Sequence, residues 1–234
     1  MSLRELRKAV KNSANKEKGI FLQGFFKTGP GEYGEGDIFA GLTVPQSRKI
    51  VRANRDLSLK ENQELIKSKI HEERLIALLI LVEQYSKGSE KERDKIFKFY
   101  LKNIKHVNNW DLVDLSAPKI IGKHLLDNDK SMLFEFTGSG NLWKRRIAIL
   151  ATQYFIQKDL LDYTFQIADK LLYDKEDLIQ KAVGWMLREA GKKDIIAQTE
   201  FLKSRYKKMP RTMLRYAIEK FSEKERQRYL KGLV

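Results

Sequence analysis

Five residues of this chain have the side chains best suited to chemistry, and they are Trp110, Asp114, Arg146, Trp185 and Arg188. A fixed carboxylate can stabilise a developing positive charge and orient a water molecule. Indole faces favour cations, and guanidinium groups hold phosphates. If these side chains share one surface, that surface could bind a nucleic acid and act on it.

The elements that must position these residues are helices that recur along the chain. A small residue inside an apolar run marks each recurrence. These residues are Ala77, Val113, Ala148, Gly184 and Ala217, and successive ones are 36, 35, 36 and 33 positions apart. Such a period is typical of stacked helical repeats. At about 100° per residue, helical geometry places the five candidate residues within roughly 120° of arc on equivalent helices. We therefore expect them on one face.

A second amphipathic helix follows each of these runs, with apolar residues three and four positions apart. These second helices are expected in residues 91–104, 129–137, 159–172, 194–205 and 223–234. Strand-like alternation of useful length is absent from the sequence, and so is the consensus of the tetratricopeptide unit. The predicted fold class is all-α, a HEAT-like or ARM-type helical-repeat solenoid with a concave basic face.

The same repeats predict the domain organisation, because stacked units share their core with both neighbours. A single domain is expected over residues 1–234, with N-terminal helices and a glycine-rich loop in 1–44 and helical repeats in 45–234. The glycines of residues 28–37 lack the GK[ST] ending of a phosphate loop, and acidic residues lie among them. We interpret this segment as a surface turn.

The charge balance indicates a polyanionic partner. The chain has 46 basic and 31 acidic side chains, which gives a formal net charge of +15. Such an excess attracts nucleic acid and makes binding depend strongly on salt. The basic residues are spread over the whole length, which favours double-stranded DNA along the repeats. A basic protein whose lysines are merely solvated is the alternative, because net charge does not report where charges lie.

Composition also indicates where in the cell the protein works and which cofactors it can hold. The chain has no cysteine, which fits a reducing cytosol and excludes disulfides and cysteine-based zinc sites. A signal-like or membrane-spanning apolar run is not found, so we expect a cytoplasmic protein. The three histidines, His71, His106 and His124, lack the spacing of zinc ligands. We expect no metal, no cofactor, no membrane partner and a monomer.

Each candidate residue also has a structural explanation. A tryptophan in a helical protein often fills the core, and Trp143, outside the pattern, is predicted to do so. Asp114 lies inside an apolar run, where a carboxylate must be partnered or functional. Arg146 and Arg188 could simply neutralise it. Asp127 and Asp129 fall in a turn between helices, where helix caps are the ordinary interpretation.

At these residues the chain resembles a known family, the AlkD-like alkylpurine DNA glycosylases, which are HEAT-like repeat proteins. The matching segments are GLTVPQSR at 41–48, NNWDLVD at 108–114, LWKRRIAIL at 142–150 and IQKAVGWMLRE at 179–189. The resemblance implies hydrolysis of the N-glycosidic bond of positively charged N3- and N7-alkylated purines, such as 3-methyladenine and 7-methylguanine, in duplex DNA. It also implies catalysis without a pocket that encloses the base.

The resemblance further implies roles for individual residues. Asp114 corresponds to the catalytic aspartate, and Trp110 and Trp185 correspond to the aromatic pair that flanks the lesion nucleotide. Arg146 corresponds to an arginine that contacts a phosphate, and Arg188 to one on the same concave face. Where the family's model member has a tyrosine near the lesion, this chain has Phe25 or Phe26. Lys144 and Lys123 are possible phosphate contacts.

The chemistry is consistent with these residue types. An alkylated purine is already cationic and leaves readily, so the sugar, which gains oxocarbenium character, is the group that needs stabilisation by Asp114. No lysine stands out as a Schiff-base nucleophile, and a monofunctional glycosylase is therefore expected. The alternatives are a non-catalytic HEAT-like protein that binds distorted or branched DNA and, less favoured by the charge, a protein-binding scaffold.

Overall fold

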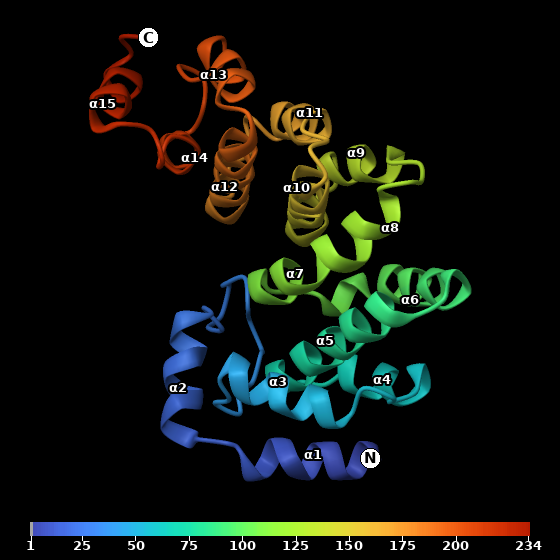
Figure 1. Cartoon of the computed structure of the whole chain (residues 1–234). Coiled ribbons are helices and arrows are strands. Elements are labelled where there is room, and N and C mark those ends of the chain that lie inside the picture. Colours follow the sequence, from blue (N-terminus) through green and yellow to red (C-terminus); the bar gives the residue numbers. More distant parts are fainter. Residues whose placement is uncertain (1) are drawn as a thin grey trace. The chain divides into compact units, whose positions relative to one another are not determined.

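The regular secondary structure of this protein is helical. The computed structural model describes residues 2–234 (Figure 1), and apart from one isolated parallel bridge between Ile38 and Ile70 its regular elements are helices. The predicted all-α class is confirmed, and so is the predicted repeat of helix pairs. The chain forms two compact units, 2–116 and 117–234. The single domain and the concave basic face stay predictions.

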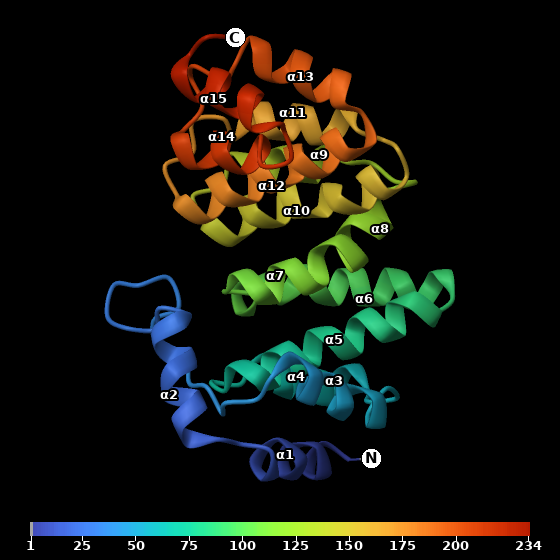
Figure 2. The same ribbon diagram turned by 60° about the vertical axis from the view of Figure 1, so that its left-hand side comes forward.

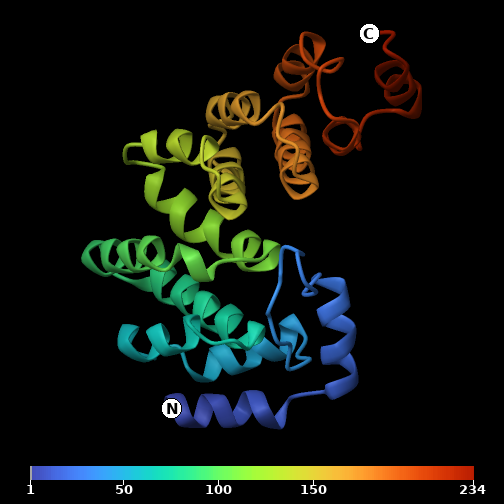
Figure 3. The same cartoon turned by 180° about the vertical axis from the view of Figure 1, so that it is seen from behind.

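The first unit is built around a long central helix, α5, which packs against α1, α3, α4 and α6. Its helices are α1 Leu3–Asn12, α2 Lys16–Phe25, α3 Val44–Ala53, α4 Leu59–Ile66, α5 His71–Lys87, α6 Glu90–Lys102, a short 3₁₀ turn Ile104–His106, and α7 Trp110–Ala117. The glycine-rich loop that follows α2 runs to α7, as Figure 3 shows from behind.

The second unit consists of two rows of helices. Its elements are a π-helical turn Pro118–Gly122, α8 Lys123–Leu125, α9 Ser131–Thr137, α10 Leu142–Gln157, α11 Asp162–Lys170, α12 Asp177–Lys193, α13 Ile195–Lys203, α14 Arg211–Ala217 and α15 Glu223–Lys231. Helices α10, α12 and α14 pack side by side in one row, and α9, α11 and α13 form the other (Figure 2).

Helix starts follow from local side-chain chemistry. At α3, the amide of Gln46 donates to the Thr43 hydroxyl over 3.3 Å, and the amide of Thr43 donates to the Gln46 side chain over 2.8 Å. Ser58 and Glu61 form the same reciprocal pair at α4. Such a capping box satisfies amides that have no partner inside the helix. The residue types of segment 41–48 are therefore explained by the capping box that begins α3.

The five repeat anchors occupy the core, as the period predicts. Ala77, Val113, Ala148 and Ala217 are buried, and each lies inside a helix. The fifth anchor, Gly184, lets α12 approach α14 closely: a Cβ there would lie 2.4 Å from the Met213 carbonyl oxygen. A small residue is thus required at Gly184, where α12 meets α14, and the other four anchors recur as buried positions.

Candidate functional site

Helix α7 presents Trp110 and Asp114 on one side and buries the other. Both side chains are partly exposed, whereas Leu112, Val113 and Ser116 are buried. A separation of four residues places Trp110 and Asp114 one above the other on a helix. The predicted pairing of an indole with a carboxylate on one helix is therefore present.

The ring of Trp110 is held in a group of aromatic side chains from α2. Phe26 is buried and stacks on it with a centroid separation of 4.9 Å and an interplanar angle of 11°. Phe25 meets Trp110 edge to face at 6.0 Å and is 56% exposed. Of the two phenylalanines, Phe25 is therefore the exposed one, and its role beside a lesion stays a prediction.

The buried side of α7 is closed by a tyrosine. The Tyr100 hydroxyl is 3.0 Å from Ser116 Oγ, and that oxygen donates in turn to the Leu112 carbonyl over 2.5 Å. Burial raises the pKa of Tyr100, the hydrogen bond to Ser116 opposes this, and the negative charge of Asp114 raises it further. Tyr100 therefore stays protonated.

In the second unit, Trp185 and Arg188 share one acidic partner on α12. Trp185 Nε1 donates to Glu189 Oε1 over 3.2 Å, and Arg188 Nη2 donates to the same oxygen over 3.2 Å. Lys192 Nζ donates to Glu189 Oε2 over 2.7 Å, and Arg188 also pairs with Glu219. Burial alone would raise the pKa of Glu189, but the hydrogen bonds and charges of Lys192 and Arg188 lower it. The indole orientation is thus fixed by an ionised carboxylate.

Arg146 is a buried residue of α10, and its phosphate contact stays a prediction. It is 5% exposed, and its Nη1 donates to the Leu178 carbonyl over 2.5 Å, which joins α10 to the start of α12. Lys144, on the same helix, holds its ammonium 5.5 Å from the ring centre of Phe136. Trp143 is buried, which confirms its predicted core role.

Some of the predicted site residues lie together within each unit. Trp110, Asp114 and Phe25 gather around α7 in the first unit, and Trp185 and Arg188 lie on α12 in the second. A single site made from both groups stays a prediction. Asp129 accepts a hydrogen bond from the Ser131 amide over 3.1 Å, but the N-cap residue of α9 is Lys130, so Asp129 stabilises the turn before the helix rather than capping it.

Several residues that contact the candidate site residues or their helices were not predicted. Asp111, the second residue of α7, contacts buried His71, and Asp37 contacts the other nitrogen of that ring. The interpretation of residues 28–37 as a mere surface turn is wrong at Asp37, because this carboxylate is buried. Glu189 was also missed, although its spacing of four residues from Trp185 is a readable signal.

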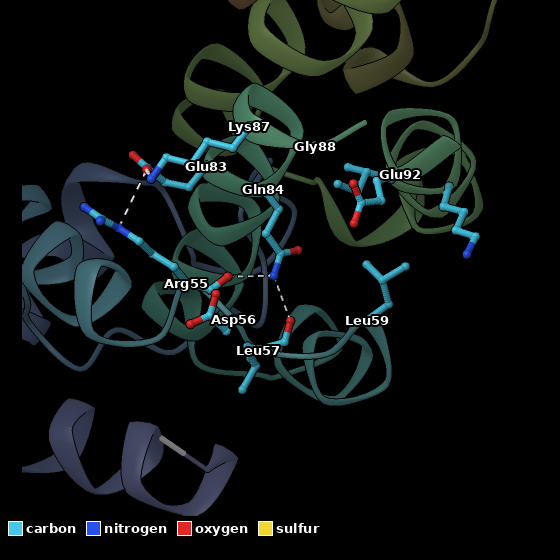
Figure 4. Close-up of a pocket in the computed structure, with 11 residues that line it drawn as sticks. Arg55, Asp56, Leu57, Leu59, Glu83, Gln84, Lys87, Gly88 and Glu92 are labelled. Atoms are coloured by element: carbon cyan, nitrogen blue, oxygen red, sulfur yellow. Dashed lines mark hydrogen bonds and ion pairs between the residues drawn. The ribbon is translucent and has the colours of Figure 1, made fainter. Parts of the chain in front are cut away.

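A pocket of about 480 Å³ lies in the first unit away from these residues. It opens between the turn before α4, the end of α5 and α6, and the residues that define it include Arg55, Leu57, Glu83 and Gln84 (Figure 4). The Gln84 amide donates to the carbonyls of Arg55 and Leu57, each over 2.8 Å. Glu83 follows His71 by 12 residues on α5, or roughly 18 Å along its axis. The pocket is therefore remote from the start of α5.

Residues 2–234 contain neither a metal-binding cluster nor a membrane-spanning helix. No group of three or more histidine, cysteine, aspartate or glutamate side chains in this part of the chain is arranged to hold a metal ion. Among the same residues, no helix has the length and apolar character that crossing a membrane requires.

Comparison with known proteins identifies the family of this chain. The sequence profile of a family described as DNA alkylation repair enzyme matches residues 6–221. The fold is similar to that of a solved structure described as a predicted DNA alkylation repair enzyme from Enterococcus faecalis, with a TM-score of 0.70 and 18% identity over 90% of this chain and 98% of that one. A search of curated proteins gives no match. Because the profile covers most of its length, this chain belongs to the DNA alkylation repair enzyme family.

Proposed function

We propose that this protein is a monofunctional DNA glycosylase of the AlkD-like kind, which releases N3- and N7-alkylated purines such as 3-methyladenine and 7-methylguanine from duplex DNA. The observation that carries the proposal is the side of α7, where the partly exposed Asp114 carboxylate lies one turn from the aromatic group of Trp110 and Phe25. Carboxylate and ring faces are the groups that favour a cationic sugar. We further propose that the protein acts as a monomer in the cytoplasm.

The proposed reaction is a hydrolysis. The C1′–N bond breaks, and its electron pair goes to the purine, which thereby loses its positive charge. The deoxyribose gains oxocarbenium character, which the negative charge of Asp114 stabilises. A water oxygen that Asp114 orients then forms the new bond at C1′ and releases a proton. The products are the free alkylated base and an abasic site.

The remaining residues are proposed to hold the DNA. Trp110, Trp185 and Phe25 would contact the sugar and backbone of the lesion nucleotide through their ring faces. Arg146, Arg188 and Lys144 would contact phosphates, and the net charge of +15 would make this binding fall steeply with salt. Arg188 is engaged by Glu189 and Glu219, so a phosphate would have to replace one of these partners.

The test is single-turnover release of 7-methylguanine from an oligonucleotide duplex by the wild-type protein and by Asp114→Asn. Release that depends on Asp114 supports the proposal. Tight, salt-dependent binding without release would instead support the second candidate, a non-catalytic protein that binds distorted DNA, which the basic charge favours. A covalent adduct trapped with borohydride would contradict the monofunctional assignment.

A further inference from the structure

His71, the first residue of α5, lies between two carboxylates. It is 1% exposed; its Nδ1 is 3.1 Å from Asp37 Oδ2, and its Nε2 is 2.8 Å from Asp111 Oδ2. A carboxylate only accepts hydrogen bonds, so both ring nitrogens must donate and the imidazole must carry two protons. Burial opposes this charge and Arg74 adds to the opposition, but the two aspartates outweigh them and raise the pKa of His71.

The charges around the imidazolium are balanced inside the protein. Arg74 Nη2 donates to Asp37 Oδ2 over 2.5 Å, and its Nη1 donates to the Ser68 carbonyl over 2.8 Å. Two aspartates therefore face two cations, His71 and Arg74. Buried charges persist only when they are paired in this manner. Burial raises the pKa of Asp37, but the hydrogen bond from His71 and the charge of Arg74 lower it overall.

A cluster of aromatic rings connects the His71–aspartate network to Trp110. Phe39 stacks on His71 with a centroid separation of 4.3 Å, and Phe26 stacks on Phe39 at 4.9 Å. Phe26 in turn stacks on Trp110 at 4.9 Å. Phe26 also lies 5.2 Å from the His71 ring, so it contacts both the imidazolium and the indole of the candidate site.

The network also joins three segments that are distant in sequence. Asp37 ends the glycine-rich loop 28–37, His71 begins α5, and Asp111 lies in the first turn of α7. The loop folds back closely on the end of α2 and reaches the residue before α7: a Cβ on Gly34 would lie 2.6 Å from the Phe26 carbonyl oxygen and 3.3 Å from Asn109 Nδ2. Only a glycine permits this approach.

We infer that His71 is a positioning residue, which fixes the rotation of α7 through Asp111 and so aims Trp110 and Asp114 at the substrate. The inference rests on the proposed function. Three residues separate Asp111 from Asp114, so their side chains point about 60° apart around the helix axis. A contact that fixes Asp111 therefore fixes the direction of Asp114. The Tyr100–Ser116 hydrogen bond and the stacking of Trp110 on Phe26 also hold α7, and the contact of His71 with Asp111 adds a buried charged pair at its first turn.

The test compares His71→Asn and Asp111→Asn with a matched control, Glu73→Gln. Glu73 lies on the same turn of α5 and is buried, but its partner is Arg7 of α1, at 3.4 Å, rather than α7. All three variants remove one charge that is buried in the wild type, and the control does so away from α7. We expect the His71 and Asp111 variants to excise 7-methylguanine about 10- to 100-fold more slowly, with DNA affinity little changed, and the Glu73 variant to keep the wild-type rate.

Two comparisons make the test specific. The double variant with both His71→Asn and Asp111→Asn should be no slower than the slower single variant, because both changes break one connection. Hydrogen exchange of the segment 108–116 should accelerate in His71→Asn and not in Glu73→Gln. Equal slowing of excision in the Glu73 variant, or unchanged exchange of 108–116 in His71→Asn, would overturn the inference.

The exchange measurement also separates this inference from the proposed function. If the wild-type protein releases no base, the glycosylase assignment fails while the exchange of residues 108–116 still decides whether His71 holds α7. If excision depends on Asp114 but not on His71, the proposed function stands and the positioning role is refuted.

Discussion

The change of Asp114 to asparagine is expected to separate catalysis from DNA binding. Asparagine keeps the size and one oxygen of aspartate and removes its negative charge. At about 4 Å, opposite unit charges attract by about 1 kcal/mol in bulk water and about 4 kcal/mol at an effective dielectric of about 20. Asp114 is partly exposed, so its interaction with the developing sugar cation falls between these limits.

The rate effect follows from this range. A loss of about 1.4 kcal/mol in transition-state stabilisation corresponds to a factor of about ten in rate. A value near the middle of the range, about 2.5 kcal/mol, predicts that Asp114→Asn excises about 100-fold more slowly. DNA affinity should stay the same or rise slightly, because one negative charge near the phosphates is lost.

The assay is single-turnover release of 7-methylguanine with enzyme in excess, beside fluorescence anisotropy of the same duplex. Asp94→Asn is a suitable control, because it removes a carboxylate from α6 that is exposed and paired with Lys98 at 2.7 Å. This control should keep the wild-type rate. A full rate in Asp114→Asn, or equal slowing in both variants, would refute the catalytic assignment.

Three further changes have defined outcomes. Arg146→Ala should weaken both DNA binding and excision, and should lower the free energy of unfolding by about 1–3 kcal/mol because the Leu178 carbonyl loses its buried donor; denaturant titration and anisotropy measure both. Trp185→Phe should keep more activity than Trp185→Ala, because it loses only the bond to Glu189, and single-turnover rates compare them. The pKa of His71 is raised by folding, so its stabilisation is complete below the unfolded pKa of about 6.5 and is lost as pH rises through the folded pKa; unfolding titrations from pH 6 to 9 should show this decline in the wild type and a flatter profile in His71→Asn.

The helices could be predicted from the sequence because their period reports a packing requirement. Ala77, Val113, Ala148 and Ala217 are buried where neighbouring helices meet, and Gly184 permits the closest approach. The same buried helix position therefore recurs once in each helical repeat. The pairing of Trp110 with Asp114 followed from the same geometry, because residues four apart share a side of any helix.

The buried network could not be predicted in this way. The partners of His71 lie 34 and 40 residues away along the chain, so no local period connects them. Asp37 also lies in a glycine-rich loop, whose acidic residues suggested exposure. Arg146 shows the opposite difficulty, since the charge of an arginine suggests a surface position while the fold buries it against the Leu178 carbonyl.

The ionisation states around α7 favour substrates whose base leaves without help. His71 and Tyr100 have raised pKa values, but both are buried and hydrogen-bonded inside the first unit. Their protons stabilise α7 and its surroundings, and both rings lie in the core rather than beside the exposed ring of Phe25. A purine that carries a positive charge needs no proton in order to leave, whereas a neutral base does. The proposed glycosylase would therefore rely on Asp114 and the sugar cation, and it would act on a cationic lesion better than on a neutral one.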